Sequence, residues 1–332
     1  MPPVDVLAGG FPCQDLSQAG RTGGIFAEQS GLEKEMFRLT ESMRPAPKWV
    51  LIENVPFMLQ LDQGRAMEVL TKTLSELGYT WAYRVVDTRA FGLPQRRQRV
   101  ILLASKYDDP RTVLFADEAG EPTLEDVHGQ TAYGFYWTEG VRGLGWGIDC
   151  VPTLKGGSTV GIPSPPAVWL PDGRIVTPGI NDAERLQGFP RDWTKAARRA
   201  SSRKGARWKL IGNAVSVPVA RWVGRRLVRP DRPLLDSGPV DGRWPAAAWG
   251  RRGRAYEARG LSIWPVRYKR KQLAEFLDPE PTLLSLRAAR GFRNRTSKSS
   301  LRFRDEFLKA VDAHIRFMAF LEDEDANSAA SA

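Results

Sequence analysis

Three clusters of reactive side chains each adjoin a short apolar run within the first hundred residues. The clusters are Pro12-Cys13-Gln14 after the run that starts at Val4, Glu53-Asn54 after Trp49 to Ile52, and Gln95-Arg96-Arg97-Gln98-Arg99 before Val100 to Ala104. A thiol, a carboxyl and guanidinium groups are thus placed at strand ends, where α/β sheets build their sites. The pattern indicates an enzyme, with Cys13 as the candidate nucleophile.

Alternating strands and helices are predicted to position these clusters within residues 1–106. The apolar runs predict strands at 4–8, 49–52, 81–87 and 100–104 and helices at 32–44 and 66–77. In the second helix Met67, Leu70 and Leu74 lie on one apolar face, and Gly78 is a natural stop. We therefore expect an α/β fold with a doubly wound sheet.

Two further motifs lie downstream. They are Ala183-Glu184-Arg185-Leu186-Gln187-Gly188-Phe189-Pro190 and the stretch from Lys209 to Ala220, which contains Asn213-Ala214-Val215. All five clusters, in this order, resemble the motifs of the DNA cytosine-5 methyltransferases of bacteria and phages. The resemblance covers roughly residues 4 to 228. It implies a Rossmann-like, S-adenosylmethionine-dependent enzyme that flips a cytosine out of double-stranded DNA and methylates carbon 5, as in restriction-modification.

The family normally begins with a strand and a glycine-rich turn that hold the methionine part of S-adenosylmethionine. Acidic residues on its next two strands hold ribose and adenine. Only Met1-Pro2-Pro3 precedes Val4, so we expect a sheet missing its first strands. Either a separate N-terminal methyltransferase segment completes the enzyme, or the chain is a DNA-binding remnant or regulatory subunit. RNA methylation by the same chemistry is a third hypothesis.

The resemblance assigns a role to each catalytic candidate. The Cys13 thiolate adds to C6 of cytosine and makes C5 nucleophilic, with Pro12 against the cofactor and Gln14 against the substrate. Glu53 contacts N3 of the ring; alternatively it caps the following helix or pairs with an arginine. Arg97 lies near O2 of the base and the thiol, and Arg99 holds a carboxylate.

Two groups of binding candidates complete the expected site. Gln95 positions its loop or contacts a backbone phosphate. Asn213, Ala214 and Val215 border the methionine end of the cofactor, where a helix N-terminus suits a carboxylate; alternatively Gly212-Asn213 is simply a helix N-cap. The motif from Glu184 to Pro190 is expected to be scaffold.

The net charge of +11 is concentrated in two segments. The segment from Arg191 to Arg229 contains twelve Lys or Arg and one acidic residue, and the segment from Arg243 to Arg304 contains sixteen Lys or Arg and four acidic residues. Basic segments on an otherwise acidic chain indicate a polyanionic partner, here DNA. For the second segment, ordinary solvated basic helices are the alternative.

Composition also excludes several classes of protein. The two cysteines, Cys13 and Cys150, and the two histidines, His128 and His314, lack the spacing of a disulfide framework or a zinc site. No metal is therefore expected. No apolar run approaches the ~18 residues of a membrane span, and no signal peptide is evident. We expect a cytoplasmic protein of a bacterium or a phage-infected cell.

The predicted domains follow these motifs. Residues 1–106 and 173–229 form the catalytic lobe, 107–172 a short target-recognition region, and 230–332 a basic, helical C-terminal extension. The aromatic residues of the recognition region, such as Tyr133, Phe135 and Trp137, either stack beside DNA bases or form the core of a small β-rich lobe. Residues 301–321 predict an amphipathic helix.

Overall fold

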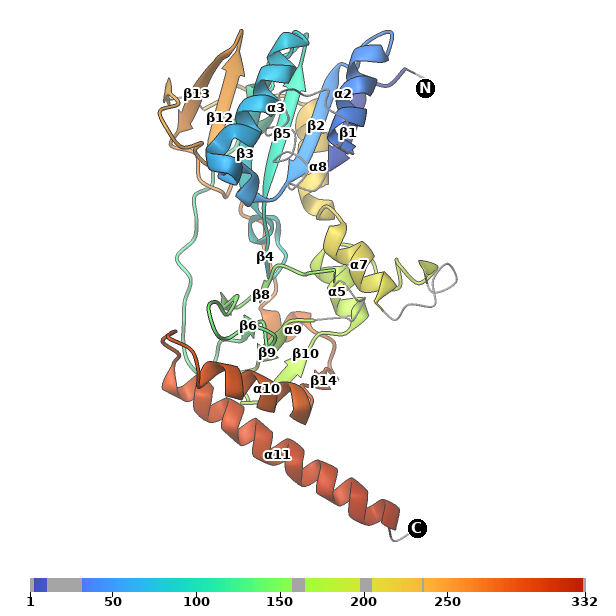
Figure 1. Ribbon diagram of the computed structural model, residues 1–332, viewed down its shortest axis with the longest axis vertical. Helices are drawn as coiled ribbons and strands as arrows, with labels where there is room; N and C mark the ends of the chain where they lie inside the picture. The colour runs from blue at the N-terminus through green and yellow to red at the C-terminus, as the bar shows by residue number, and fades with distance from the viewer. Residues whose placement is uncertain (1–2, 11–31, 157–164, 198–204, 235, 331–332) are drawn as a thin grey trace. The chain divides into compact units, whose positions relative to one another are not determined.

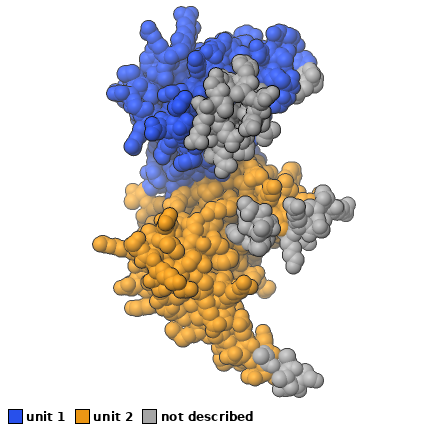
Figure 2. Space-filling model, viewed as in Figure 1, with its two compact units in different colours: residues 1–91, 98–122, 218–268 blue, residues 92–97, 123–217, 269–332 orange. Residues whose placement is uncertain are grey.

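The computed structural model describes residues 3–10, 32–156, 165–197, 205–234 and 236–330. The chain divides into two compact units (Figure 2). The first consists of residues 1–91, 98–122 and 218–268, and the second of residues 92–97, 123–217 and 269–332. Each unit has its own sheet and core and is described by itself.

A seven-stranded sheet forms the centre of the first unit, in the order β1-β2-β5-β3-β12-β13-β11 (Figure 1). The strands are β1 (Val6–Gly10), β2 (Trp49–Asn54), β3 (Thr80–Asp87), β5 (Gln98–Ser105), β11 (Asp236–Pro239), β12 (Ala247–Arg251) and β13 (Arg254–Arg259). The four strands predicted from the apolar runs are thereby confirmed to within two residues at each end.

The sheet is mixed, not wholly parallel as a doubly wound sheet would be. Only β1 and β2 pair in parallel, and β5 lies antiparallel to both β2 and β3. The ten residues between β3 and β5 are too few for the helical crossover that parallel neighbours need. A short return from β3 therefore leads into an antiparallel strand.

Helices cover both faces of this sheet. They are α2 (Leu32–Ser42) and α3 (Arg65–Glu76) on one face and α4 (Arg111–Leu114) and α8 (Val217–Val228) on the other, with short 3-10 turns η1 (Pro56–Leu59), η2 (Leu61–Gly64) and η3 (Thr88–Phe91). A hydrophobic core lies on each face, and alternate residues of β5 pack into them: Leu102 packs in the core with α3, and Leu103 in the core with α8. Burial on both faces explains the unbroken apolar run from Val100 to Ala104.

Part of the expected C-terminal extension belongs to this sheet. β12 pairs with β3, so that Trp249 lies opposite Ala82 and Gly250 opposite Trp81. Ala248 is fully buried in the same core as α3. Residues 236–259 therefore complete the edge of the sheet next to β3. The predicted boundaries of the catalytic lobe, the recognition region and the extension, at residues 106, 172 and 229, stay predictions.

The second unit contains a five-stranded sheet in the order β14-β10-β9-β6-β7 and a parallel pair, β4-β8. Its strands are β4 (Gln95–Arg96), β6 (Tyr133–Phe135), β7 (Gly147–Ile148), β8 (Val151–Pro152), β9 (Ala167–Trp169), β10 (Ile175–Thr177) and β14 (Thr282–Leu283). Its helices are α5 (Ile180–Leu186), α7 (Ala206–Asn213), α9 (Leu273–Phe276), α10 (Leu286–Thr296) and α11 (Asp305–Ala330).

Two cores lie on opposite faces of this sheet. Val168 and Val176 pack with α5 and α7, and the alternating neighbours Trp169 and Ile175 pack with α10 and α11. Phe307, Val311 and His314 form the buried side of α11, which confirms the predicted amphipathic helix.

The aromatic residues of the predicted recognition region belong largely to this core. Tyr133 and Phe135 are at most 1% exposed, and the ring centroid of Phe135 lies 4.9 Å from that of Phe307. Rings enclosed in this way are not available to stack on bases. The second alternative, a small β-rich lobe with an aromatic core, is the one that the structure favours.

None of the described helices is long and apolar enough to cross a membrane. The described side chains also contain no group of three or more His, Cys, Asp or Glu arranged to hold a metal ion.

Replacing Gly250 by alanine should destabilise the first unit. A Cβ at this position would lie 2.3 Å from Cζ2 of Trp81, a side chain that is 2% exposed. Overpacking of this kind costs about 1–3 kcal/mol, measurable by urea unfolding followed by circular dichroism.

The control for this experiment is Gly224→Ala on α8. Among the described residues, a Cβ added there meets no atom within 4 Å, so stability should stay unchanged or rise by up to about 1 kcal/mol. Equal stability of the two variants would contradict the packing of β12 against β3.

Candidate functional site

The ends of β1 and β2 bring the first two predicted clusters to one edge of the sheet. The parallel register places Gly10 opposite Glu53, and a Cβ on Gly10 would lie 3.6 Å from Oε2 of Glu53. Pro12, Cys13 and Gln14 follow β1 in the sequence but lie outside the described residues. Gly10, the last described residue before these three, thus lies beside the Glu53 carboxylate.

Glu53 forms an ion pair with Arg99. The Arg99 Nε atom lies 2.8 Å from Oε1 of Glu53, and the two side chains are only 13% and 17% exposed. Burial lowers the pKa of Arg99, and the Glu53 charge opposes that effect. Glu53 and Arg99 thus contact each other in the structure, and the N3 contact expected of Glu53 and the carboxylate-holding role expected of Arg99 stay predictions.

Gln95 is fully buried within the second unit. Its Nε2 donates to the Leu186 carbonyl at 2.7 Å, and its Oε1 accepts from the Leu154 amide at 3.0 Å. Because both ends of the amide bind protein backbone, the structure favours loop positioning over phosphate contact for this residue.

Arg97 is 2% exposed and binds the turn that links α7 to α8. Its Nη2 donates to the carbonyl oxygens of Gly212 and Ala214, at 3.1 and 2.9 Å. The residue expected beside the base is thus bound to the segment that carries the cofactor candidates.

Gln187 and Ser216 fix the same turn. The Gln187 Nε2 donates to the Ile211 carbonyl at 3.0 Å, and the Ser216 hydroxyl donates to Oε1 of Gln187 at 2.6 Å. Both residues are buried. Gln187 belongs to the motif that was expected to be scaffold, whereas the sequence reasoning assigned Ser216 no role of its own.

The cofactor candidates differ in accessibility. Asn213 and Val215 are exposed, whereas Ala214 is half-buried. Gly212 must lack a side chain because a Cβ there would lie 2.4 Å from the Gly156 nitrogen.

Asn213 is the last residue of α7 and therefore not a helix N-cap, and Val215 lies two residues before α8. The first amide of α8, on Val217, already donates to the Gln187 carbonyl at 2.9 Å, and Pro218 has no N–H. The turn thus exposes the Asn213 and Val215 side chains and not the first N–H groups of α8.

A buried ion pair joins α5 to α7. Oε1 of Glu184 accepts from Arg207 Nη2 and from the Thr194 amide, both at 2.8 Å. Burial raises the pKa of Glu184, but hydrogen bonds from Arg207 and Thr194 outweigh it and lower the pKa overall. This geometry agrees with the expected scaffold role of the motif at 183–190.

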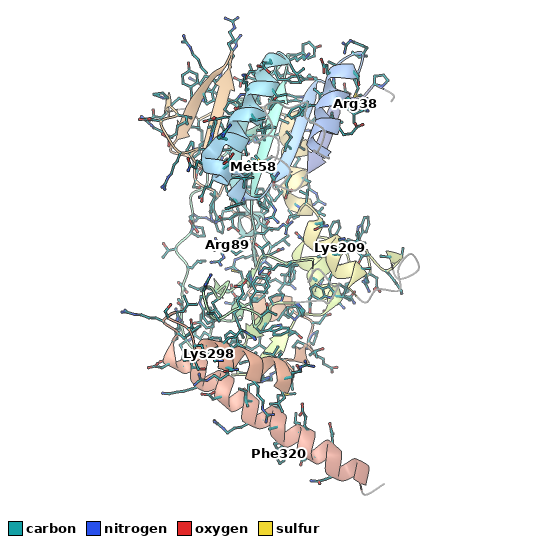
Figure 3. All side chains as sticks on the ribbon, viewed as in Figure 1. Arg38, Met58, Arg89, Lys209, Lys298 and Phe320 are labelled. Carbon is teal, nitrogen blue, oxygen red and sulfur yellow. The ribbon has the colours of Figure 1, made fainter. Side chains whose placement is uncertain are left out.

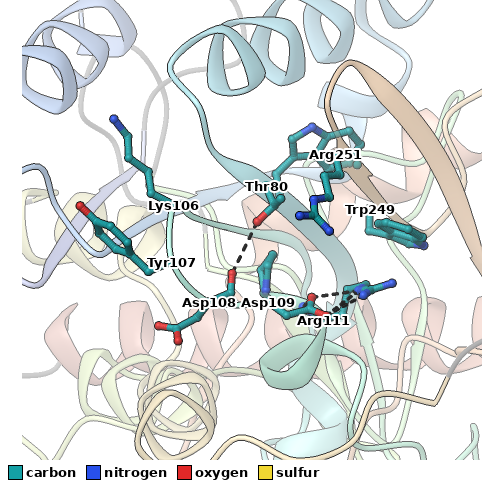
Figure 4. A pocket seen from close by; sticks show the side chains of 11 residues that line it. Thr80, Lys106, Tyr107, Asp108, Asp109, Arg111, Trp249 and Arg251 are labelled. Carbon is teal, nitrogen blue, oxygen red and sulfur yellow. Dashed lines mark hydrogen bonds and ion pairs between the residues drawn. The ribbon is translucent and has the colours of Figure 1, made fainter.

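A separate hollow of about 220 Å³ lies at the opposite end of the first sheet, where Thr80 pairs with Ser105 (Figure 4). The Arg111 guanidinium lies 4.1 Å from the Trp249 ring centroid, and its Nη2 is 2.7 Å from the Asp109 carboxylate. The hollow lies at the opposite end of the strands from Glu53 and is therefore separate from the candidate site.

Comparisons with known proteins agree with the expected chemistry. The family model of the C-5 cytosine-specific DNA methylases matches residues 1–131 and 174–229. The type II methyltransferase M2.BsuMI of Bacillus subtilis (strain 168) is 49% identical over 324 residues, which are 94% of this chain and 83% of that protein.

More distant proteins match a smaller part of the chain. The type II methyltransferase M.BsuFI of Bacillus subtilis is 38% identical over 67% of this chain and 57% of that protein. The solved structure of the S. pombe Dnmt2 methyltransferase has a TM-score of 0.46 at 16% identity, over 68% of this chain and 78% of that chain.

The stability of the second unit should depend on pH through Glu184. A carboxyl whose pKa is lowered by folding stabilises the fold above its ordinary pKa of 4.5 and loses that contribution as the pH falls further. Glu184→Gln should therefore lower the unfolding free energy by about 2–4 kcal/mol at pH 7, and by less at pH 4.

Urea unfolding of both proteins at pH 7, 5.5 and 4 measures this difference. Glu280→Gln, which alters an exposed carboxyl of the same unit, should change stability little at any of these pH values. A Glu184→Gln deficit that stayed constant with pH would show that the carboxylate charge is not what stabilises α5 against α7.

Proposed function

The chain belongs to the C-5 cytosine-specific DNA methylase family, and we propose that it transfers a methyl group from S-adenosylmethionine to carbon 5 of cytosine in double-stranded DNA. The observation that carries this proposal is the Glu53–Arg99 pair at the end of β2, beside the strand that leads into Pro12-Cys13-Gln14. Its relatives named as type II methyltransferases support a role in restriction-modification, and hence in the cytoplasm.

Cys13 acts as the nucleophile in this proposal. Its thiolate adds to C6 of a cytosine that has been flipped out of the duplex, and the electrons shift to C5. S-adenosylmethionine, when bound, would supply an electrophilic methyl group and leave as S-adenosylhomocysteine. Once C5 has taken the methyl group, its proton passes to solvent, the C5–H electron pair reforms the C5–C6 double bond, and the C6–S bond breaks with its electron pair returning to the Cys13 thiolate. Gln14 contacts the substrate.

Glu53 and Arg99 stabilise the charge that develops on the cytosine ring. Charge that develops on the ring during thiolate attack is relieved by a proton or a strong hydrogen bond at N3, which the Glu53 carboxyl provides. Arg99 sets the orientation of that carboxyl through an ion pair in which its Nε atom lies 2.8 Å from Oε1 of Glu53. Because Arg97 donates to Gly212 and Ala214, we assign it to positioning the turn at 212–216.

Asn213, Ala214, Val215 and Pro12 would hold the methionine end of the cofactor. The support for this is the turn between α7 and α8, held by three buried side chains, with Asn213 exposed at the end of α7 and Val215 exposed just before α8. No metal enters the proposed reaction.

A second candidate is that the chain is one part of a split methyltransferase, or a DNA-binding remnant of one. Among the described residues β1 pairs only with β2, and its residues alternate between exposed and half-exposed. An edge of this kind can accept a further strand. A separate N-terminal methyltransferase segment that added strands there would complete the cofactor pocket.

Cys13→Ser should abolish methyl transfer and covalent trapping while leaving DNA binding largely intact, because a serine hydroxyl is a far weaker nucleophile than a thiolate. The measurement is a denaturation-resistant complex with duplex DNA that contains 5-fluorocytosine. Cys150→Ala, which alters the other, fully buried cysteine, should still be trapped. An adduct that persisted in Cys13→Ser would place the nucleophile elsewhere.

Adding a polypeptide that carries the family's opening strand and glycine-rich turn should strengthen S-adenosylmethionine binding to this chain, because among the described residues the outer edge of β1 is unpaired and can accept a further strand. Isothermal titration calorimetry measures the affinity with and without that polypeptide, with circular dichroism as the control for folding. An affinity that the added polypeptide left unchanged would contradict this second candidate.

A further inference from the structure

The basic residues of the second unit's C-terminal part fall into two groups. One group is bound within the protein. Arg293 pairs with Asp312 at 2.8 Å, Arg295 Nε donates to the Glu139 carbonyl at 3.0 Å, and Arg304 Nη1 lies 3.0 Å from the Asp126 carboxylate. These arginines stabilise the unit, and their donors are not free for a polyanion.

The other group lies on the outer face of α10. Arg287, Arg290 and Asn294 on the helix, and Lys298 just beyond its end (Figure 3), are all exposed. We call these four residues the α10 stripe. Their spacing of three and four residues places them on one side of the helix. The opposite side, Ala288, Ala289, Phe292 and Thr296, is buried.

The α10 stripe carries three positive charges with no acid near it in the sequence. Residues 286–304 contain no Asp or Glu. Within the described part of the chain, Arg287, Arg290 and Lys298 form none of the observed ion pairs, unlike Arg293 and Arg304. The helix thus holds uncompensated cations in a row about 16 Å long, at 1.5 Å per residue.

We propose that the α10 stripe binds the phosphate backbone of the DNA substrate, outside the site that takes the target cytosine. The inference rests on the proposed function, which makes duplex DNA the partner. Phosphates recur every ~3.4 Å of helix axis along each strand, so a row of this length can contact several of them. Arg, Lys and Asn side chains donate to phosphate oxygens without reading the sequence. The stripe also lies outside the residues that match the family model.

The test is the variant Arg287→Gln, Arg290→Gln, Lys298→Gln, compared with the parent by fluorescence anisotropy on a labelled duplex from 50 to 300 mM salt. Each lost phosphate contact should reduce the slope of log affinity against log salt by about 0.9. We expect a slope shallower by about 2 to 3, an affinity at low salt weaker by about tenfold or more, and methylation of the same cytosines.

A matched control removes the same charge elsewhere. Lys72→Gln, Lys309→Gln, Arg316→Gln alters three exposed cations away from the stripe and should leave the slope nearly unchanged. Arg295→Gln should lower stability and not the slope, since that side chain binds protein carbonyls.

The outcomes separate this inference from the proposed function. Anisotropy needs no methyl transfer, so a parent protein that binds DNA but is inactive still tests the stripe. A folded stripe variant with the parental slope, or a control triple with the same effect as the stripe triple, would overturn the inference. A third result would also overturn it: a stripe variant that binds DNA normally but no longer forms a dimer seen for the parent in sedimentation. The stripe would then contact a second copy of the chain, for example the acidic segment from Glu322 to Asp325 of that copy.

Discussion

The buried guanidinium of Arg97 is the contact on which the second unit's functional turn depends. A carbonyl oxygen that is shielded from water costs about 1–3 kcal/mol if it has no donor, and Arg97 supplies donors to two of them, on Gly212 and Ala214. Gln187 and Ser216 complete the same network from α5 and from the turn itself. Hydrogen bonds of this kind restrain the turn, as a site would need if Asn213 and Val215 are to be held in place between α7 and α8.

In the first unit, two partly buried charged side chains form an ion pair at the end of the sheet. Glu53 and Arg99 come from strands that lie next to each other, β2 and β5, and each neutralises the other in surroundings where an isolated charge would be costly. The rest of the unit keeps these strands rigid: helices cover both faces, and β12 continues the sheet beyond β3. Residues more than one hundred and forty positions later in the chain therefore help to fix the sheet that carries the carboxylate.

Arginine is used in two distinct ways in this chain. Arg84 is fully buried and donates to the carbonyls of Ser262 and Asp117, and Arg207 pairs with Glu184 between two helices. These side chains replace apolar packing at places where backbone carbonyls or carboxylates converge. On α10, by contrast, the arginines point to solvent beside a buried face of alanine and phenylalanine. The total of 49 Lys and Arg residues thus overstates the number of cations that a DNA backbone can reach.

The sequence by itself determined the features that depend on neighbours along the chain. Apolar periodicity predicted the four N-terminal strands and the helices α2, α3 and α11, and the ordered motifs predicted the family, because each of these patterns is contained in a short stretch of the sequence. Contacts between distant segments were decided only by the tertiary structure. Three sets of contacts join residues at least forty positions apart. They are the pairing of β12 with β3, the packing of Tyr133 and Phe135 in one core with Phe307, and the hydrogen bonds that Arg97 and Arg295 donate to backbone carbonyls. Local spacing carries no information on such partners, because a basic or aromatic side chain has the same pattern whether it meets solvent, DNA or a carbonyl of its own chain.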